Sequence, residues 1–144
     1  MNAIQLLIDE HNKARAALAD ISKDTHSYEE KKKLFDELCY ILIRHETMEE
    51  QVWYPYLKNN ENVSDEVKQL ISEEQHAVKA IEEFKYISEE AEWESKFAQF
   101  KEAAEAHASE EEQKLFPQVA KIISESELEE IGRQMVDFER NYHA

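Results

Sequence analysis

Two eleven-residue segments of the chain repeat residue types that bind metal ions. "HETMEEQVWYP" occupies residues 45–55 and "HASEEEQKLFP" occupies residues 107–117, and five of the eleven positions are identical. Both segments have the form His-x-x-x-Glu-Glu-Gln-x-x-x-Pro. Imidazole nitrogens and carboxylate oxygens are ligands for first-row transition metals. The repeat therefore indicates two similar half-sites for metal.

The spacing within each copy places histidine and glutamate on one side of a helix. Positions four apart differ by about 40° around an α-helix, so His45 with Glu49, and His107 with Glu111, each point one way. The spacing alone is weak evidence, because the chain has 33 acidic residues among 144 and exposed helix pairs share it. His26 has the same spacing to a glutamate without the rest of the motif. Both repeated pairs, in contrast, fall on apolar stripes.

The elements that position these pairs are amphipathic helices. Apolar residues recur at three- and four-residue steps over residues 4–21, 34–57, 70–87 and 93–115, which predicts four long helices. Trp53 and Tyr56 are expected on the second stripe. Capping boxes predict helix starts at Ser27 and at Ser126, where a short fifth helix begins. The predicted fold is all-α, an antiparallel four-helix bundle plus a short C-terminal helix, in one domain of residues 1–144.

Composition excludes several other classes of protein. One glycine and two prolines leave little for strands, hairpins or a glycine-rich phosphate loop. A net charge of −16 disfavours binding to nucleic acid and to anionic membranes. Cys39 has no partner for an internal disulfide and lies in an apolar run, so it is predicted to be a buried core residue. With no basic-then-apolar leader at the N-terminus, the protein is expected in the cytoplasm.

The other two long helices each add one histidine. His11 lies on the first stripe and His76 on the edge of the third, so two similar helical hairpins follow one another. The predicted metal ligands are His11, His45, Glu49, His76, His107 and Glu111. Six nitrogen and oxygen ligands without a thiolate exceed one tetrahedral zinc site. They suit two metal ions bridged by the glutamates, with iron favoured and manganese second.

This pattern resembles the hemerythrin-like, or HHE cation-binding, family from His11 to about Pro117. The resemblance implies a four-helix bundle around two iron ions that are bridged by two carboxylates and an oxo or hydroxo species. The oxygen carriers of that family have a His-x-x-x-His pair on the third helix. Here the positions four residues before and four residues after His76 are Ser72 and Ala80, and neither can replace an imidazole. Reversible oxygen carriage is therefore not expected. Four histidines and two glutamates are most similar to the metal domain of the repair-of-iron-centres proteins.

Several functions fit such a centre. A non-haem di-iron protein binds or reacts with O2, NO or peroxide, in sensing, detoxification or iron handling, and a protein partner for iron or redox signalling is compatible with this. The sequence leaves open whether the protein turns over a substrate, as a ferroxidase or peroxidase does. The alternative is a metal-free acidic helical module for protein interaction, which would make six inward ionisable residues an accident.

Residues next to the predicted ligands are a further set of candidates. Carboxylates at or near neighbouring positions either hold the imidazole N–H groups or belong to ordinary solvated faces. These carboxylates are Glu10, Glu46, Glu73 and Glu110. Pro55 and Pro117 are expected to end or kink their helices.

Overall fold

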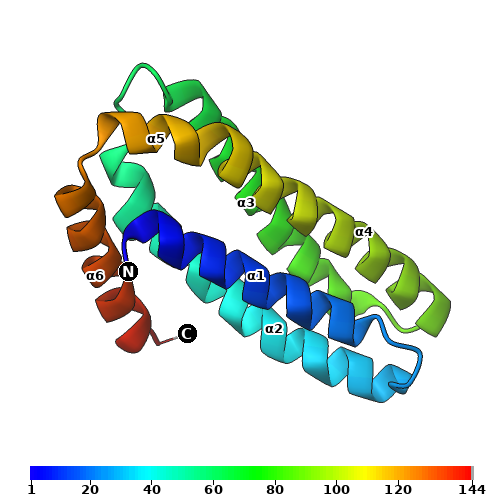
Figure 1. Cartoon of the computed structure of the whole chain (residues 1–144). Helices are drawn as coiled ribbons and strands as arrows, with labels where there is room; N and C mark the ends of the chain where they lie inside the picture. The colour runs from blue at the N-terminus through cyan, green and yellow to red at the C-terminus, as the bar shows by residue number, and fades with distance from the viewer. Residues whose placement is uncertain (144) are drawn as a thin grey trace.

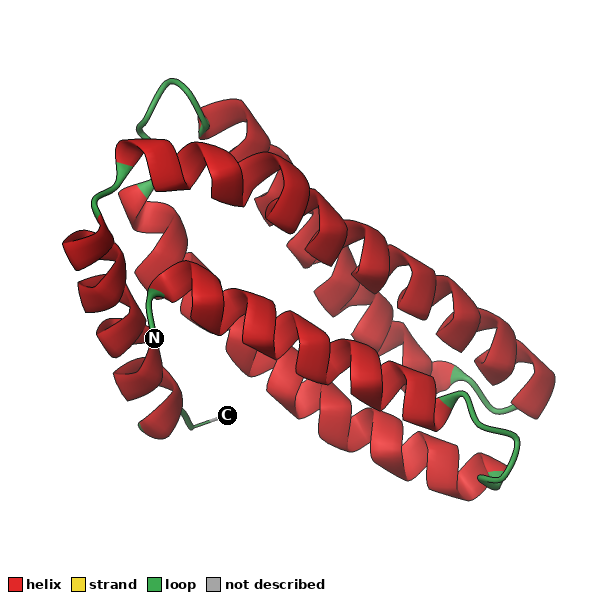
Figure 2. Cartoon of the chain, viewed as in Figure 1, coloured by secondary structure: helices red, strands yellow, loops and turns green. Residues whose placement is uncertain are grey.

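The computed structural model describes residues 1–143, and every regular element in that range is helical (Figure 2). The long helices are α1 (Ala3–Ile21), α2 (Tyr28–Met48), α3 (Ser64–Glu83) and α4 (Glu90–Glu110), followed by α5 (Phe116–Ile122) and α6 (Glu125–Arg140). Short segments of other helix types are η1 (Glu49–Trp53), η2 (Tyr54–Tyr56), η3 (Phe84–Tyr86) and η4 (Glu111–Leu115). The predicted all-α bundle with an added C-terminal helix is confirmed. No helix in the described range is long and apolar enough to cross a bilayer.

The four long helices run alongside one another, and α6 lies across one end of the bundle (Figure 1). That end also holds the N-terminus and α5, whereas the α1–α2 and α3–α4 connections lie at the opposite end. α6 packs on α1, α2 and η1. Gly132 permits the close approach to the N-terminus, because a Cβ at this position would lie 2.6 Å from the carbonyl oxygen of Met1.

Side-chain caps begin the helices where the sequence offers them. The hydroxyl of Ser27 accepts a hydrogen bond from the backbone N–H of Glu30 at the start of α2, as predicted. α6 begins two residues earlier than expected. Its N-cap is Ser124 rather than Ser126, and the hydroxyl of Ser124 accepts a hydrogen bond from the backbone N–H of Glu127. Both serines have a glutamate three residues on, so the local pattern does not choose between them. In the observed helix Leu128 is buried, in one hydrophobic cluster with Leu7 and Met48.

Each copy of the repeated motif contains a π-helical segment that begins at its first glutamate. The N–H of Tyr54 donates to the carbonyl of Glu49, and the N–H of Phe116 donates to that of Glu111, five residues back. The wider π turn contains one more residue than an α turn, so the residues after it that face the interior are shifted by one position along the sequence. Tyr54 and Phe116 are therefore buried, while Tyr56 is 48% exposed. The expectation that Tyr56 continues the apolar stripe is wrong, because it assumed a regular α-helical period.

The two prolines follow these π segments. Pro55 lies in η2, after which the helix ends at Leu57, and Pro117 lies in the first turn of α5, where helix continues to Ile122. Proline is tolerated in the first turn because its missing N–H has no helical partner there. The helix ends shortly after Pro55, as predicted. Helix continues past Pro117, where the irregularity is the π segment that precedes the proline.

Two hydrophobic cores divide the bundle. The terminal core, around the N-terminus, α5 and α6, includes Leu7, Met48, Trp53, Tyr54, Leu115, Phe116 and Met135. The distal core, at the opposite end, includes Leu18, Phe35, Leu38, Cys39, Ile81, Trp93, Phe97 and Phe100. Burial raises the pKa of the Cys39 thiol to about 12, so this residue serves packing, as predicted. The ionisable residues of the repeated motif lie between the two cores.

Candidate metal centre

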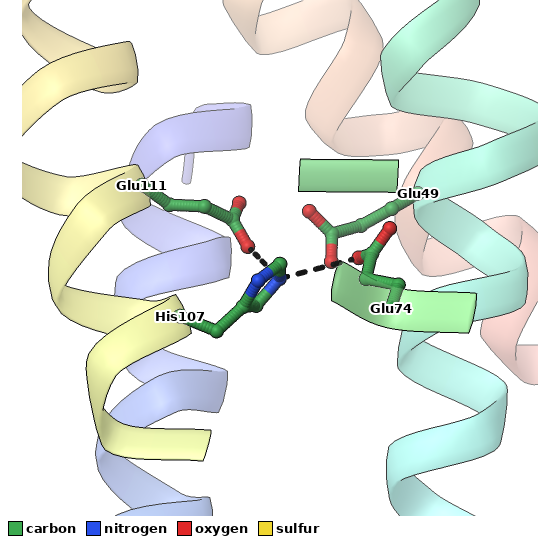
Figure 3. A group of neighbouring side chains, drawn as sticks. All are labelled: Glu49, Glu74, His107 and Glu111. Carbon is green, nitrogen blue, oxygen red and sulfur yellow. Dashed lines mark ion pairs between the residues drawn. The ribbon is translucent and has the colours of Figure 1, made fainter. Parts of the chain in front are cut away.

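Four side chains from two halves of the bundle meet in the interior. Glu49, Glu74, His107 and Glu111 each offer one ligand atom, and these atoms all lie within 4.8 Å of one another. Figure 3 shows His107 and Glu111 facing Glu49 and Glu74. The three glutamates are no more than 1% exposed. Three carboxylates buried together are costly unless a cation or a proton accompanies them.

Two further histidines border this group. The Nε2 atom of His45 lies 2.9 Å from Oε1 of Glu49, and Nε2 of His11 lies 3.8 Å from Oε1 of Glu111. The His11 and His45 rings are neighbours, with centroids 5.5 Å apart. The resulting set is called the central cluster below. It consists of His11, His45, Glu49, Glu74, His107 and Glu111.

Five of the six residues that the sequence predicts as ligands lie in the central cluster, and His76 does not. His76 is exposed, and its Nδ1 atom donates to the carbonyl of Ser72 at 2.8 Å. α3 instead turns Leu70, Glu74 and Ile81 toward the interior. Residues two apart on a helix point about 200° apart, so Glu74 and His76 cannot both face inward.

Sequence reasoning missed Glu74, although a signal was present. Glu74 is four residues after Leu70 and seven before Ile81, so it continues the inward stripe of α3. The histidine on each of the other three long helices made His76 the expected ligand on α3. A buried carboxylate at the same level provides an oxygen ligand instead.

An outer carboxylate contacts the Nδ1 atom of each histidine in the central cluster. The distances are 2.6 Å from His45 to Glu10, 2.9 Å from His107 to Glu73, and 2.8 Å from His11 to Glu112. An ionised carboxylate only accepts hydrogen bonds, so these contacts hold the proton on Nδ1. The Nε2 atoms of the rings face the centre, where they could bind a metal ion in place of a proton, as in many metal sites.

The outer carboxylates were predicted in part. Glu10 and Glu73 contact ring nitrogens, whereas Glu46 and Glu110 make no hydrogen bond to these histidines. Glu112, which was missed, is the second glutamate of the repeated motif. Arg15 fixes it with two hydrogen bonds, from its Nη1 and Nη2 atoms at 2.9 and 3.0 Å.

The electrostatics of the central cluster are those of a site without enough positive charge. Burial, together with nearby Glu49, raises the pKa of Glu74 to about 11 and that of Glu111 to about 8. Burial opposes ionisation of Glu49 too, but His45 outweighs it and holds the pKa of Glu49 well below its ordinary value. Burial disfavours the charged His107 ring, yet Glu111 and Glu74 raise its pKa to about 12. Without a metal ion, bound protons would have to offset the charge of the carboxylates.

Many polar atoms of the central cluster have no hydrogen-bond partner. These buried atoms are both carboxylate oxygens of Glu49, Glu74 and Glu111 and the Nε2 atoms of His11 and His107. Some of them lie in close ion-pair contacts that are not counted as hydrogen bonds, since Oε1 of Glu49 lies 2.9 Å from Nε2 of His45 and Oε1 of Glu111 lies 3.0 Å from Nε2 of His107. Buried polar groups are rarely left unpaired in folded proteins. Six oxygens and two nitrogens directed at one place, with no thiolate, could hold a metal ion.

Two aromatic residues close the centre on the side of the terminal core. The hydroxyl of Tyr54 is buried and has no hydrogen-bond partner. Burial, with Glu49 and Glu111 nearby, raises the pKa of Tyr54 well above its ordinary value, so the hydroxyl stays protonated and available as a donor. Phe116 stacks on His11, with ring centroids 6.1 Å apart and planes inclined by 9°. Both residues occupy the same place in their copies of the motif.

Comparison with known proteins agrees with this geometry. A family model described as the hemerythrin HHE cation binding domain matches residues 2–119. The match contains the whole central cluster and ends before α6. Comparison with curated proteins and with solved structures gives no match. The chain belongs to the hemerythrin HHE cation-binding family.

Proposed function

We propose that this protein holds two iron ions at the central cluster and binds or reacts with O2, NO or peroxide. Manganese is the second choice of metal. The observation that carries the proposal is the convergence of buried carboxylate oxygens and Nε2 ring nitrogens of Glu49, Glu74, Glu111, His11 and His107, which make no hydrogen bond and contact only one another and His45 as ion pairs. Imidazole and carboxylate ligands in a bundle interior are those of known di-iron and di-manganese sites. When bound, iron would supply electrons and open positions for small oxygen- or nitrogen-containing ligands.

The protein's own residues have separate tasks in this proposal. The glutamates of the central cluster provide the oxygen ligands, and Glu49 and Glu111 are the candidates to bridge two ions. The three histidines provide terminal nitrogen ligands, each oriented by its outer carboxylate. The Tyr54 hydroxyl is a hydrogen-bond donor at the edge of the centre. The terminal core, which includes Tyr54 and Phe116, excludes water from one side of the centre.

Glu74 changes the ligand set that the sequence predicts. With Glu74 in place of His76, the set has three imidazoles and three carboxylates rather than four and two. More carboxylate favours the oxidised metal, because anionic ligands stabilise the higher charge. A third carboxylate therefore adds support to the expectation that oxygen oxidises the centre instead of being carried reversibly.

The wider setting is also part of the proposal. The lone, buried Cys39 suits the reducing cytoplasm, and a protein that supplies electrons or receives iron is a compatible partner. A metal-free interaction module is the weaker alternative. It leaves three buried glutamates and their unpartnered oxygens without a purpose.

The experiment is an anaerobic titration of reduced, iron-loaded protein, followed by its optical spectrum. We expect saturable binding of NO, and rapid oxidation by O2 that is not reversed when oxygen is pumped off. His107→Ala should abolish both responses, while His26→Ala, outside the cluster, should keep them. An oxygenated form that returns to the reduced form under vacuum would overturn the proposed reactivity in favour of oxygen carriage.

A further inference from the structure

A cavity of about 530 Å³, partly open to solvent, lies between the four long helices beside the central cluster. All four long helices contribute to its lining, and His11, His45, Glu49, Glu74 and His107 form its polar end. Away from the cluster, the lining passes to apolar side chains that belong to or pack on the distal core. These side chains are Leu18, Leu42, Phe84 and Phe100. The cavity wall is thus mostly apolar, with the cluster at one end and the charged side chains of Arg15, Glu83, Lys96 and Glu105 also reaching it.

Alanines on three helices create this space. Ala14 of α1, Ala77 and Ala80 of α3, and Ala103 and Ala104 of α4 line the cavity. The two cores on either side are filled by large residues, such as the Phe35, Trp93 and Phe97 cluster with ring centroids 5.2 to 5.8 Å apart. Protein interiors are otherwise close-packed. The level of the bundle next to the metal centre is therefore left open by small side chains.

The cavity is too large for a diatomic ligand alone. One water molecule occupies about 30 Å³ in the liquid, and a diatomic gas needs space of the same order. The 530 Å³ cavity exceeds this more than tenfold and falls within the range of small-molecule pockets, roughly 300–1,000 Å³. An apolar wall with a few polar groups at one end is also the usual lining of such pockets.

The charges at the cavity select against an anionic ligand. Among its described lining residues, the basic side chains are already paired: Arg15 lies 2.7 Å from Glu105, and Lys96 lies 3.8 Å from Glu83. Further carboxylates, Glu46, Glu73 and Glu110, also line the cavity. In the metal-free protein, a carboxylate or phosphate head group would meet net negative charge at these side chains. An uncharged molecule meets no such barrier.

We propose that the cavity binds an uncharged small organic molecule with an apolar body, which lies along the alanines while its polar end reaches the central cluster. The inference rests on the proposed function for any reaction at the cluster, but the binding itself depends only on the cavity. The protein would then act on, or be regulated by, an organic ligand in addition to a diatomic one.

The test uses primary n-alkanols of four to ten carbons as probes, titrated by calorimetry into metal-free and iron-loaded protein. We expect affinity to rise about fourfold per added methylene until the cavity is full, and then to level off. Methyl NMR should show contacts from the bound chain to Ala77, Ala80 and Ala104. Ala80→Leu and Ala104→Leu, on facing helices, should each lower affinity at least tenfold. Ala120→Leu, at an exposed position of α5, is the matched control and should bind as the wild type does.

The outcomes separate this inference from the proposed function. Protein that fails to hold iron, yet binds alkanols in the metal-free form with this dependence on length, supports the cavity and refutes the metal proposal. Absence of a length dependence in the wild type overturns the inference, whether or not the leucine variants fold. Equal affinity in the folded leucine variants and the wild type also overturns it.

Discussion

Among single residues, Glu74 has the largest effect on the charge of the central cluster, because it adds a third buried carboxylate. It is 1% exposed, and its Oε1 atom lies 3.6 Å from Nε2 of His107. Ionised together with Glu49 and Glu111, it would offset most of the positive charge that two divalent ions bring. Without metal, burial disfavours the charged form of Glu74 and the carboxylate of Glu49 repels it. Together these two effects raise the pKa of Glu74 to about 11.

Substitution of Glu74 and of His76 distinguishes the two ligand sets. Glu74→Ala should lower metal affinity at least tenfold, because it removes two of the buried oxygens that converge on the centre. His76→Ala should leave metal content unchanged, because this ring is exposed and bonded to Ser72. The measurement is elemental analysis after dialysis against a weak chelator. Loss of metal from the His76 variant alone would restore the ligand set predicted from the sequence.

The repeated motif made most of the central cluster predictable, because one His-x-x-x-Glu pair in each copy fixes both direction and level on a helix. α3 carries no copy of the motif. Glu73, Glu74 and His76 all lie within four residues, and each is a good ligand type. Which of them faces inward depends on the rotation of α3 against its neighbours, and an apolar stripe defines that rotation only approximately.

The π segments explain at the scale of elements why each motif ends in an aromatic residue and a proline. The extra residue in the turn places Tyr54 and Phe116 five positions after the glutamates, against the central cluster. π segments of this kind occur often at functional sites. A regular period of 3.6 residues does not predict a π segment. For this reason the sequence pattern predicted Tyr56, rather than Tyr54, on the buried face.

α6 lies outside the family match and still reaches the surroundings of the metal centre. Its Glu139 lies 3.7 Å from Nε of Arg44, beside Glu10, the carboxylate that contacts His45. Burial and a hydrogen bond with Glu10 raise the pKa of Glu139 to about 7. The helix therefore adds a third member to the chain of contacts behind His45.

The raised pKa of Glu139 predicts a particular dependence of stability on pH. The unfolded chain loses this proton near pH 4.5, its ordinary value, and the folded protein near pH 7. Between these values the folded state binds more protons, so stability falls as pH rises through this window. Thermal unfolding followed by circular dichroism at pH 5 and pH 8 should show a smaller pH dependence for Glu139→Gln than for wild type. Exposed Glu129→Gln is the control, and an unchanged pH dependence in Glu139→Gln would refute the assignment.

The whole molecule places an ionisable centre between two apolar cores. Amphipathic periodicity was sufficient to predict the bundle, because four stripes with short connections have few ways to bury their apolar faces. The cavity beside the centre was not predictable, since it depends on alanines of separate helices meeting at one level. Metal that binds only the folded state would offset the cost of burying the carboxylates.

Removal of metal should therefore destabilise the entire fold. We expect the chelated protein to melt roughly 10 °C or more below the iron-loaded form, since binding far above the dissociation constant contributes several kcal/mol. The comparison is a thermal scan of wild type and Glu49→Ala, each with and without chelator. The variant should melt at the same temperature in both conditions. If the melting temperature of the wild type is also unchanged by the chelator, the proposal that metal stabilises the fold is contradicted.

The metal content of the purified protein tests the central claim most directly. The protein should be produced without added chelator, reconstituted anaerobically with ferrous iron, separated from free metal and submitted to elemental analysis. The central cluster predicts close to two iron ions per chain, with manganese taken up when iron is withheld. Protein that retains neither iron nor manganese after reconstitution would contradict the account.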